Sequence, residues 1–234
     1  MDAPILIQGA MEVETDWLRA RLEGAEEQTL GGYSFWTGRR GGMTLVISRT
    51  GIGELNAACA TVLGIEHFHP RAVLNQGIAG AHDENLHIGD IVVGEACVHI
   101  NGWETPPRGK GEGCAPLSWI PCGKTCPTLP GDSGLAAHLL SRPYEGGRLL
   151  GGRLGSGDVF SREYDRIVWL REKWGHLCED MESVAVYQAC RRLKTPCLGV
   201  RVISNNELTG EPYTRSVGEE LQRFVLSAVE AYGA

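Results

Sequence analysis

The sequence predicts a layered α/β fold, in which helices pack against a sheet of buried strands. Short apolar segments typical of strands alternate with longer segments typical of helices along most of the 234 residues. A hydrophobic content of 42% is enough for one sizeable core. The length favours a single domain, covering residues 1–234. Several expected strands end in glycine or polar residues, as they do where open α/β sheets bind ligands.

The N-terminal half is expected to contain five strands and two helices. The expected strands cover residues 4–9, 31–38, 42–49 and 71–77, and residues 86–98 supply a turn and a fifth strand. The expected helices cover residues 10–22 and 54–67, and each follows directly on a glycine-containing turn. Small residues after the fourth strand, in the segment Gln76-Gly77-Ile78-Ala79-Gly80-Ala81, would let backbone N–H groups approach a ligand closely.

Residues 101–134 interrupt this pattern with an insertion rich in proline and glycine. Six of the eleven prolines lie here, together with Trp103 and Trp119. Loops of this length are usually functional or disordered, and two tryptophans argue against disorder. We therefore expect an ordered excursion near the mouth of a pocket or at a subunit interface, with a passive surface loop as the alternative.

The C-terminal half returns to alternating elements. Helices are expected at residues 133–140, 162–174, 183–193 and 217–232, and strands at 148–155 and 197–203. The segment from Cys178 to Asn206 carries the most chemistry. Asp180 and Glu182 precede a helix, and the strand that follows this helix ends in Arg201 and Asn205. Because polar residues at the carboxyl end of a buried strand face ligand crevices, these four side chains could share one pocket.

Composition restricts the partners and the compartment. The net charge of −7 and the pI of about 5.5 offer no electrostatic basis for binding nucleic acid or a membrane. We expect no secretion signal, because the N-terminus lacks a basic segment, and no segment approaches the ~18 apolar residues of a membrane span. Most of the eight cysteines lie in apolar runs, which favours a reduced, cytoplasmic protein.

Three cysteines in the insertion, Cys114, Cys122 and Cys126, raise the question of a metal site. Their spacings, C-x7-C and C-x3-C, do not match the paired C-x2-C pattern of zinc ribbons. We therefore expect no metal site. A local metal site or a disulfide remains the alternative to free loop cysteines.

Seven short motifs in a fixed order resemble the nucleoside phosphorylase superfamily. The chain looks most like the 5′-methylthioadenosine/S-adenosylhomocysteine nucleosidases within it, except at about residues 101–150. The motifs are Gly9-Ala10-Met11-Glu12, Thr50-Gly51-Ile52-Gly53, Gly77-Ile78-Ala79-Gly80, Ile88-Gly89-Asp90-Ile91-Val92-Val93, Ser156-Gly157-Asp158, Asp180-Met181-Glu182 and Arg201-Val202-Ile203-Ser204. The resemblance implies a three-layer α/β/α fold with a central mixed, partly barrel-like sheet. It also implies a homodimer without metal or organic cofactor that cleaves the N-glycosidic bond of a purine nucleoside.

The resemblance implies catalytic roles for three residues. Ala10-Met11-Glu12 stands where phosphorylases carry a phosphate-binding turn, and an acid there favours water over phosphate as the nucleophile. Glu12 would be the general base that activates the water. Arg201 would help to hold the water and Glu12, and Asn205 would contact the purine near N7.

Further residues would bind the substrate. Glu182 would accept hydrogen bonds from the ribose hydroxyls and stabilise positive charge on the ribose. Met181 would pack under the ribose, and Phe160 would stack on the base beside the backbone of Gly80. Ile52, Ile78 and Ser161 complete the expected set. Structural explanations compete, since Glu182 could be a first-turn helix acid, and Met181 and Phe160 could be core residues.

Asn205 departs from the pattern of the adenine-specific nucleosidases, which carry an aspartate that protonates N7. An amide cannot act as a general acid, but it can donate to a 6-oxo group. Superfamily members that act on inosine-like bases, among them futalosine hydrolases, use asparagine in this way. Ile78 also replaces a serine of the adenine-specific relatives. A hydrolase for 6-oxopurine nucleosides is therefore the main alternative, followed by a phosphorylase and a non-catalytic nucleoside-binding protein.

Overall fold

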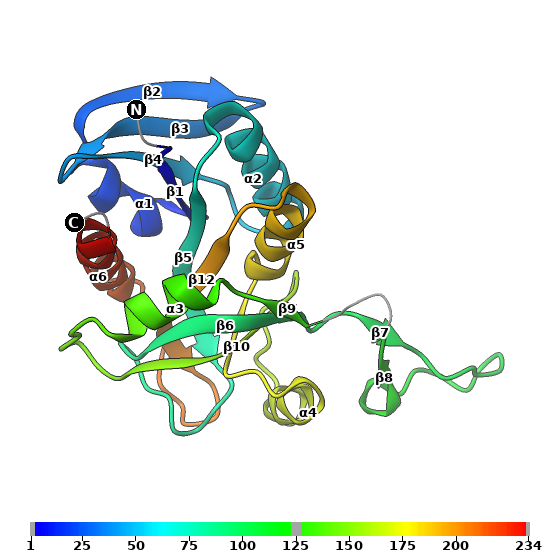
Figure 1. The fold of residues 1–234 in the computed structure, drawn as a ribbon. Coiled ribbons are helices and arrows are strands. Elements are labelled where there is room, and N and C mark those ends of the chain that lie inside the picture. The colour runs from blue at the N-terminus through cyan, green and yellow to red at the C-terminus, as the bar shows by residue number, and fades with distance from the viewer. Residues whose placement is uncertain (1–2, 123–127, 233–234) are drawn as a thin grey trace.

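The computed structural model describes residues 3–122 and 128–232 and contains a ten-stranded mixed sheet (Figure 1). Along its main path the strand order is β11-β10-β6-β12-β5-β1-β4-β3-β2, and β9 pairs with β6. The strands are β1 (Ile5–Gly9), β2 (Glu23–Leu30), β3 (Tyr33–Arg40), β4 (Met43–Arg49), β5 (Ala72–Ala81), β6 (Ile91–His99), β9 (Leu129–Pro130), β10 (Leu149–Ser156), β11 (Cys178–Asp180) and β12 (Cys197–Asn206).

Five of these strands close into a barrel. The short strand β11 runs parallel to β10 on one side and antiparallel to β5 on the other, which joins the two ends of the set β11-β10-β6-β12-β5. Strand β12 lies between β5 and β6, and all ten of its residues are buried. The polar residues at its C-terminal end therefore lie inside the molecule.

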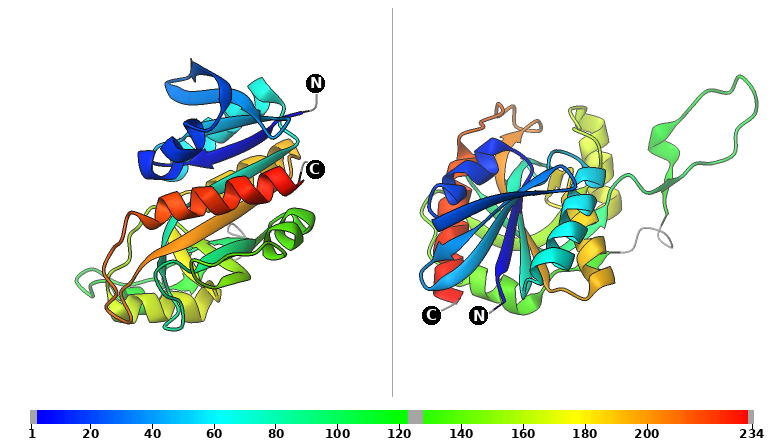
Figure 2. Two further views of the ribbon diagram at one scale, coloured as in Figure 1. Left: turned by 90° about the vertical axis from the view of Figure 1, so that its left-hand side faces the viewer. Right: turned by 90° about the horizontal axis from the view of Figure 1, so that it is seen from above.

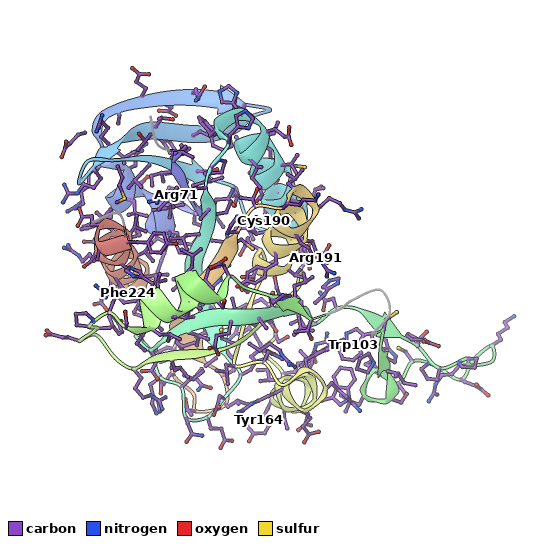
Figure 3. All side chains as sticks on the ribbon, viewed as in Figure 1. Arg71, Trp103, Tyr164, Cys190, Arg191 and Phe224 are labelled. Atoms are coloured by element: carbon purple, nitrogen blue, oxygen red, sulfur yellow. The ribbon has the colours of Figure 1, made fainter. Side chains whose placement is uncertain are left out.

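Helices cover both faces of the sheet, which confirms the predicted three-layer fold with a partly barrel-like sheet (Figures 1 and 2). One layer contains α1 (Glu12–Arg19), α3 (Ser133–Leu140) and α6 (Val217–Tyr232), with Phe224 of α6 packed in the core on this side (Figure 3). The other layer contains α2 (Glu54–Phe68) and α5 (Ser183–Leu193). Helix α4 (Tyr164–Trp174) lies beside the barrel, and no helix in the described ranges is long and apolar enough to cross a membrane.

The insertion projects from the body as an arm with little regular structure (Figures 1 and 2). It contains β7 (Trp103–Glu104), a 3-10 turn (Pro116–Ser118) and β8 (Ile120–Pro121). Trp103 anchors its base, since its ring lies 4.4 Å from that of Trp169 and 5.3 Å from that of Trp174 on α4 (Figure 3). The expected order is therefore present at this base, whereas Cys126 lies outside the described residues.

Three helices have the bounds predicted from the sequence, but several strands, among them β2 and β11, were not predicted. Strand β2 is rich in glutamate and mostly exposed, because it forms the edge of the sheet and pairs only with β3. Strand β11 has only three residues and forms through its pairing with β10 and β5. In addition, β5 continues to Ala81, four residues past its predicted end, so Gly80 belongs to the strand and not to a turn.

Candidate active site

A cavity of about 300 Å³ lies where β1, β5, β11 and β12 end, and it gathers most of the predicted site residues. Those that line it are Ile52, Ile78, Gly80, Phe160, Met181, Glu182 and Asn205. Glu12, Ser161 and Arg201 are not among the lining residues. Residues that were not predicted for the site also line the cavity, among them Glu14, Glu179 and Tyr213.

The acid at the end of β1 that faces this cavity is Glu14, not Glu12. Glu14 is 3% exposed, and its carboxylate accepts the backbone N–H groups of Ala10 at 2.6 Å, Met11 at 3.0 Å and Ile78 at 2.9 Å. The side chain of Glu12 is 60% exposed and pairs with Arg49 at 3.2 Å and Arg215 at 3.7 Å. Its own backbone N–H and Arg49 lower the pKa of Glu12, as expected for a surface acid.

The choice between these two acids depends on where helix α1 begins. Glu12 is its first residue and Glu14 its third, and two residues turn a helix by about 200°. The third position is also where a glutamate reaches back to the backbone N–H of the residue before the helix, here Met11. Because Met11 lacks the hydroxyl of a capping box, the spacing to Glu14 gives only a weak sequence signal.

Glu14 and Glu182 are two acids whose ionised forms are destabilised by their surroundings. Burial raises the pKa of Glu14, although three backbone N–H groups and the Arg201 guanidinium oppose this rise. Burial, Asp180 and Glu14 raise the pKa of Glu182 to about 8, and Gly53 N–H donates to its Oε1 at 2.8 Å. Strongly raised acid pKa values in a cavity are typical of functional sites.

Arg201 lies behind the cavity, where it balances these acids. Its side chain is 1% exposed and donates to Asp180 Oδ2 at 3.0 Å, Ser183 Oγ at 2.8 Å and the Asn75 carbonyl oxygen at 2.8 Å. It therefore acts on Glu14 and Glu182 through its charge, and the structure does not place it beside Glu12. Asp180 itself accepts five hydrogen bonds from Ser156, Glu182, Ser183 and Arg201, which makes it the anchor of this end of the site.

The other end of the cavity is built from strand ends and one aromatic ring. Asn205 is 2% exposed, and its Oδ1 lies 2.9 Å from Ser204 Oγ. Asn205 pairs in register with Gly80 of β5, whose missing side chain leaves space above the strand. Phe160, 52% exposed, stands at the rim, and Ser161 contributes a backbone N–H that donates to Glu179 Oε1 at 2.8 Å.

No group of three or more potential ligands among residues 3–122 and 128–232 has the geometry to hold a metal ion. The expectation of chemistry without a metal therefore stays a prediction. The cavity offers carboxylates, an amide and apolar walls. This set can bind a polar, partly aromatic small molecule and move one proton through Glu14.

Comparison with known proteins places the sequence in a family. Residues 4–232 match the phosphorylase superfamily. A 5′-methylthioadenosine/S-adenosylhomocysteine nucleosidase from Geobacillus kaustophilus (strain HTA426) is 34% identical over 208 residues, which are 88% of this chain and 84% of the relative.

Two solved structures extend the comparison. A methylthioadenosine/S-adenosylhomocysteine nucleosidase from Colwellia psychrerythraea 34H, in complex with adenine, has a TM-score of 0.79 and 26% identity over 98% of this chain and 95% of that one. A futalosine hydrolase of Helicobacter pylori strain 26695 has a TM-score of 0.81 and 23% identity over 97% of both chains, and so shows the shared fold. The resemblance expected from the motifs is confirmed, and the chain belongs to the phosphorylase superfamily.

Proposed function

We propose that this protein hydrolyses the N-glycosidic bond of a purine nucleoside, releasing the free base and a ribose that keeps its 5′ substituent. The observation that carries the proposal is the position of Glu14, a buried acid that lines the cavity and faces the same space as Glu182. The nucleosidase from Geobacillus kaustophilus, similar over most of its length, supports the same reaction.

In this proposal Glu14 is the general base, in the role that the motifs alone suggested for Glu12. Glu14 takes a proton from water as the water oxygen bonds to C1′ of the ribose and the bond from C1′ to N9 of the purine breaks. The three backbone N–H groups that hold the Glu14 carboxylate fix its direction before the substrate arrives. Glu12 and its arginine partners remain at the surface.

Glu182 and Met181 would form the ribose end of the cavity. Above its raised pKa of about 8, the Glu182 carboxylate accepts hydrogen bonds from ribose hydroxyls and stabilises the positive charge that develops on the ring as the bond breaks. Arg201 acts as a positioning residue, because it holds Asp180 and balances the acids without reaching the cavity itself. The departing base takes its proton from solvent, because Asn205 can only hydrogen-bond to it.

Two classes of base fit this scheme. The relatives named for methylthioadenosine and S-adenosylhomocysteine favour an adenine nucleoside with a thioether at the 5′ position. Asn205 favours a 6-oxopurine instead, because its amide N–H is a donor for a 6-oxo group.

We also propose a cytoplasmic homodimer. Ile52, at the cavity mouth, and Leu55 on α2 are 51% and 75% exposed, and a second copy would cover these apolar side chains. Buried thiols such as Cys97, Cys178 and Cys190 suit a reducing compartment. Sedimentation velocity on the wild type and on Leu55→Asp tests the dimer, since the substitution should shift the population towards monomer.

Base release from a panel of nucleosides tests the proposed reaction. The panel contains methylthioadenosine, adenosylhomocysteine, adenosine, inosine and futalosine, each assayed with and without phosphate. Release of base that is independent of phosphate is the expected result. Consumption of phosphate would identify a phosphorylase, and binding without any release would identify a nucleoside-binding protein.

A further inference from the structure

The direction of the Glu14 carboxylate depends on how two separate segments are held together. Its three N–H donors are those of Ala10 and Met11, which precede helix α1, and that of Ile78 in β5. They meet at one carboxylate only if the first turn of α1 keeps its place against β5. Burial raises the pKa of Glu14, which means that its ionised form would be more stable in water. The surrounding backbone therefore has to keep the carboxylate in place.

A buried glutamine on α6 holds the turn of α1 that carries Glu14. Gln222 is 1% exposed. Its Oε1 accepts the backbone N–H of Leu18 at 3.0 Å, and its Nε2 donates to the carbonyl oxygen of Val13 at 2.6 Å. Val13 directly precedes Glu14, and Leu18 follows it by four residues, which is the spacing of one helical turn. One side chain therefore bridges the two ends of this turn.

Helix α6 can come this close to α1 because residue 218 is a glycine. The two helices lie beside each other (Figure 1). A Cβ atom at Gly218 would lie 2.9 Å from the carbonyl oxygen of Val13 and 3.5 Å from Ile78 Cγ2. Gln222 lies one turn further along α6 and also donates to the Gly218 carbonyl oxygen at 3.1 Å, which fixes the direction of its amide. The close approach and the bridge therefore belong to one contact.

A second buried glutamine holds Glu14 from the sheet. Gln76 in β5 is 1% exposed, and its Nε2 donates to the backbone carbonyl oxygen of Glu14. It directly precedes Gly77, where a Cβ atom would lie 2.7 Å from Glu14 Oε1. The strand that gives the Ile78 N–H to the carboxylate therefore also binds the backbone of the same glutamate.

The partners of the two glutamines indicate their role. Outside its own helix, the printed sequence positions that Gln222 contacts through hydrogen bonds are Val13 and Leu18, and Gln76 donates to Glu14 between them. Among the described residues, those that line the cavity include neither glutamine. Both side chains therefore act on the backbone around Glu14 and not on a ligand.

We propose that Gln222, supported by Gln76, is a positioning residue that keeps the Glu14 carboxylate directed at the attacking water. Gln222 does so by fixing the first turn of α1 against α6, and it touches neither the water nor the nucleoside. The rate of hydrolysis then depends on the C-terminal helix, although this helix lies outside the cavity lining. This inference rests on the proposed function, because it concerns the alignment of the same base.

The first test is Gln222→Met, which keeps the length of the side chain and removes its hydrogen bonds. We expect kcat to fall by about 10- to 100-fold, as a displaced catalytic group causes, and KM to stay within about threefold, because the side chains around the substrate remain. The matched control is Val225→Ala, a fully buried core position on the same helix. It should lower Tm and leave kcat within about twofold of wild type.

A double-mutant cycle separates positioning from a general loss of folded protein. Because Gln222 acts through Glu14, Gln222→Met should lower kcat by less than about threefold when Glu14→Gln is already present. An equal loss in both backgrounds would show that Gln222 acts independently of Glu14. That result would overturn the inference while the proposed hydrolysis stands.

Amide hydrogen exchange, measured by NMR, reports the same contact without any need for activity. The N–H groups of Ala10, Met11 and Ile78 donate to the Glu14 carboxylate, so they should exchange about tenfold faster in Gln222→Met than in Val225→Ala. Equal exchange in the two variants would overturn the inference, whether or not a nucleoside is cleaved. Faster exchange without base release from any nucleoside would support the contact with Glu14 and overturn the proposed hydrolysis.

Discussion

The two ends of the cavity use carboxylates in different ways. At the proposed ribose end, Glu14, Asp180 and Glu182 lie close enough to affect one another and share the buried Arg201. At the proposed base end, Glu179 accepts a hydrogen bond from the backbone N–H of Ser161, and Asn205 lines the same cavity. The ribose end therefore holds several interacting buried charges, whereas the base end offers hydrogen-bonding groups. Substitutions at the ribose end should therefore change the rate for every substrate, and substitutions at the base end should change the choice among substrates.

The largest effect is expected from Glu14→Gln. Loss of the base that accepts the water proton should lower kcat/KM by about 10²- to 10⁴-fold for adenine and 6-oxopurine nucleosides alike. The matched control is Glu12→Gln, two residues away on the exposed side of the same helix, which should stay within about twofold of wild type. Steady-state rates on two substrates check both values. A large loss in Glu12→Gln together with a small loss in Glu14→Gln would reverse the assignment of the base.

Arg201→Met is expected to act on stability before it acts on rate. The substitution leaves Asp180 buried without its cation, and breaking a buried pair in this way costs about 3–5 kcal/mol of unfolding free energy. Urea unfolding measures the loss. Adding Asp180→Asn should restore part of the stability, because the unpaired charge is then removed. A loss below about 1 kcal/mol in the single variant would mean that the pair does not anchor this end of the cavity.

The sequence predicted one end of this comparison better than the other. The apolar run before Asn205 identified β12, and the acids before helix α5 identified Glu182, because each lies next to a long element with a strong local pattern. Glu14 was not identified, since the choice between two acids depends on the first residue of α1, and helix ends are the least certain part of such predictions.

No local signal in the sequence shows that Glu179 and Gly80 lie in strands. Glu179 belongs to a three-residue strand that exists because it closes the barrel between β10 and β5. Gly80 lies in a run of small residues that reads as a turn, yet β5 continues through it because β12 and β11 pair with it on both sides. Tertiary pairing therefore decided the conformation at both positions.

Glu182→Gln is expected to stabilise the protein at high pH. The folded state raises the pKa of Glu182 from 4.5 to about 8, so the stability linked to its proton is fully present below pH 4.5 and is lost as the pH rises through 8. A neutral glutamine removes that loss, so the gain in Tm over wild type should be larger at pH 9 than at pH 5, at about 2–4 °C for each kcal/mol.

Thermal unfolding at these two pH values measures the gain, and Glu12→Gln is again the control. The pKa of Glu12 is lowered, so removing its charge should give no gain at pH 9. If the Tm difference for Glu182→Gln does not grow with pH, the folded state does not raise the pKa of Glu182. Activity should fall in the same variant, because glutamine cannot stabilise positive charge on the ribose.

Asn205→Asp is expected to have the smallest effect, and it affects only the choice of base. The new carboxyl group would lie close to Glu207, whose Oε1 is 3.4 Å from Asn205 Nδ2, and this like charge favours its protonated form. A protonated aspartate can donate to N7 of adenine, so the kcat/KM for methylthioadenosine should rise relative to methylthioinosine by about tenfold. If Asn205→Asp instead slowed both substrates equally, Asn205 would belong with the residues that set the rate, and the contrast between the two ends would fail there.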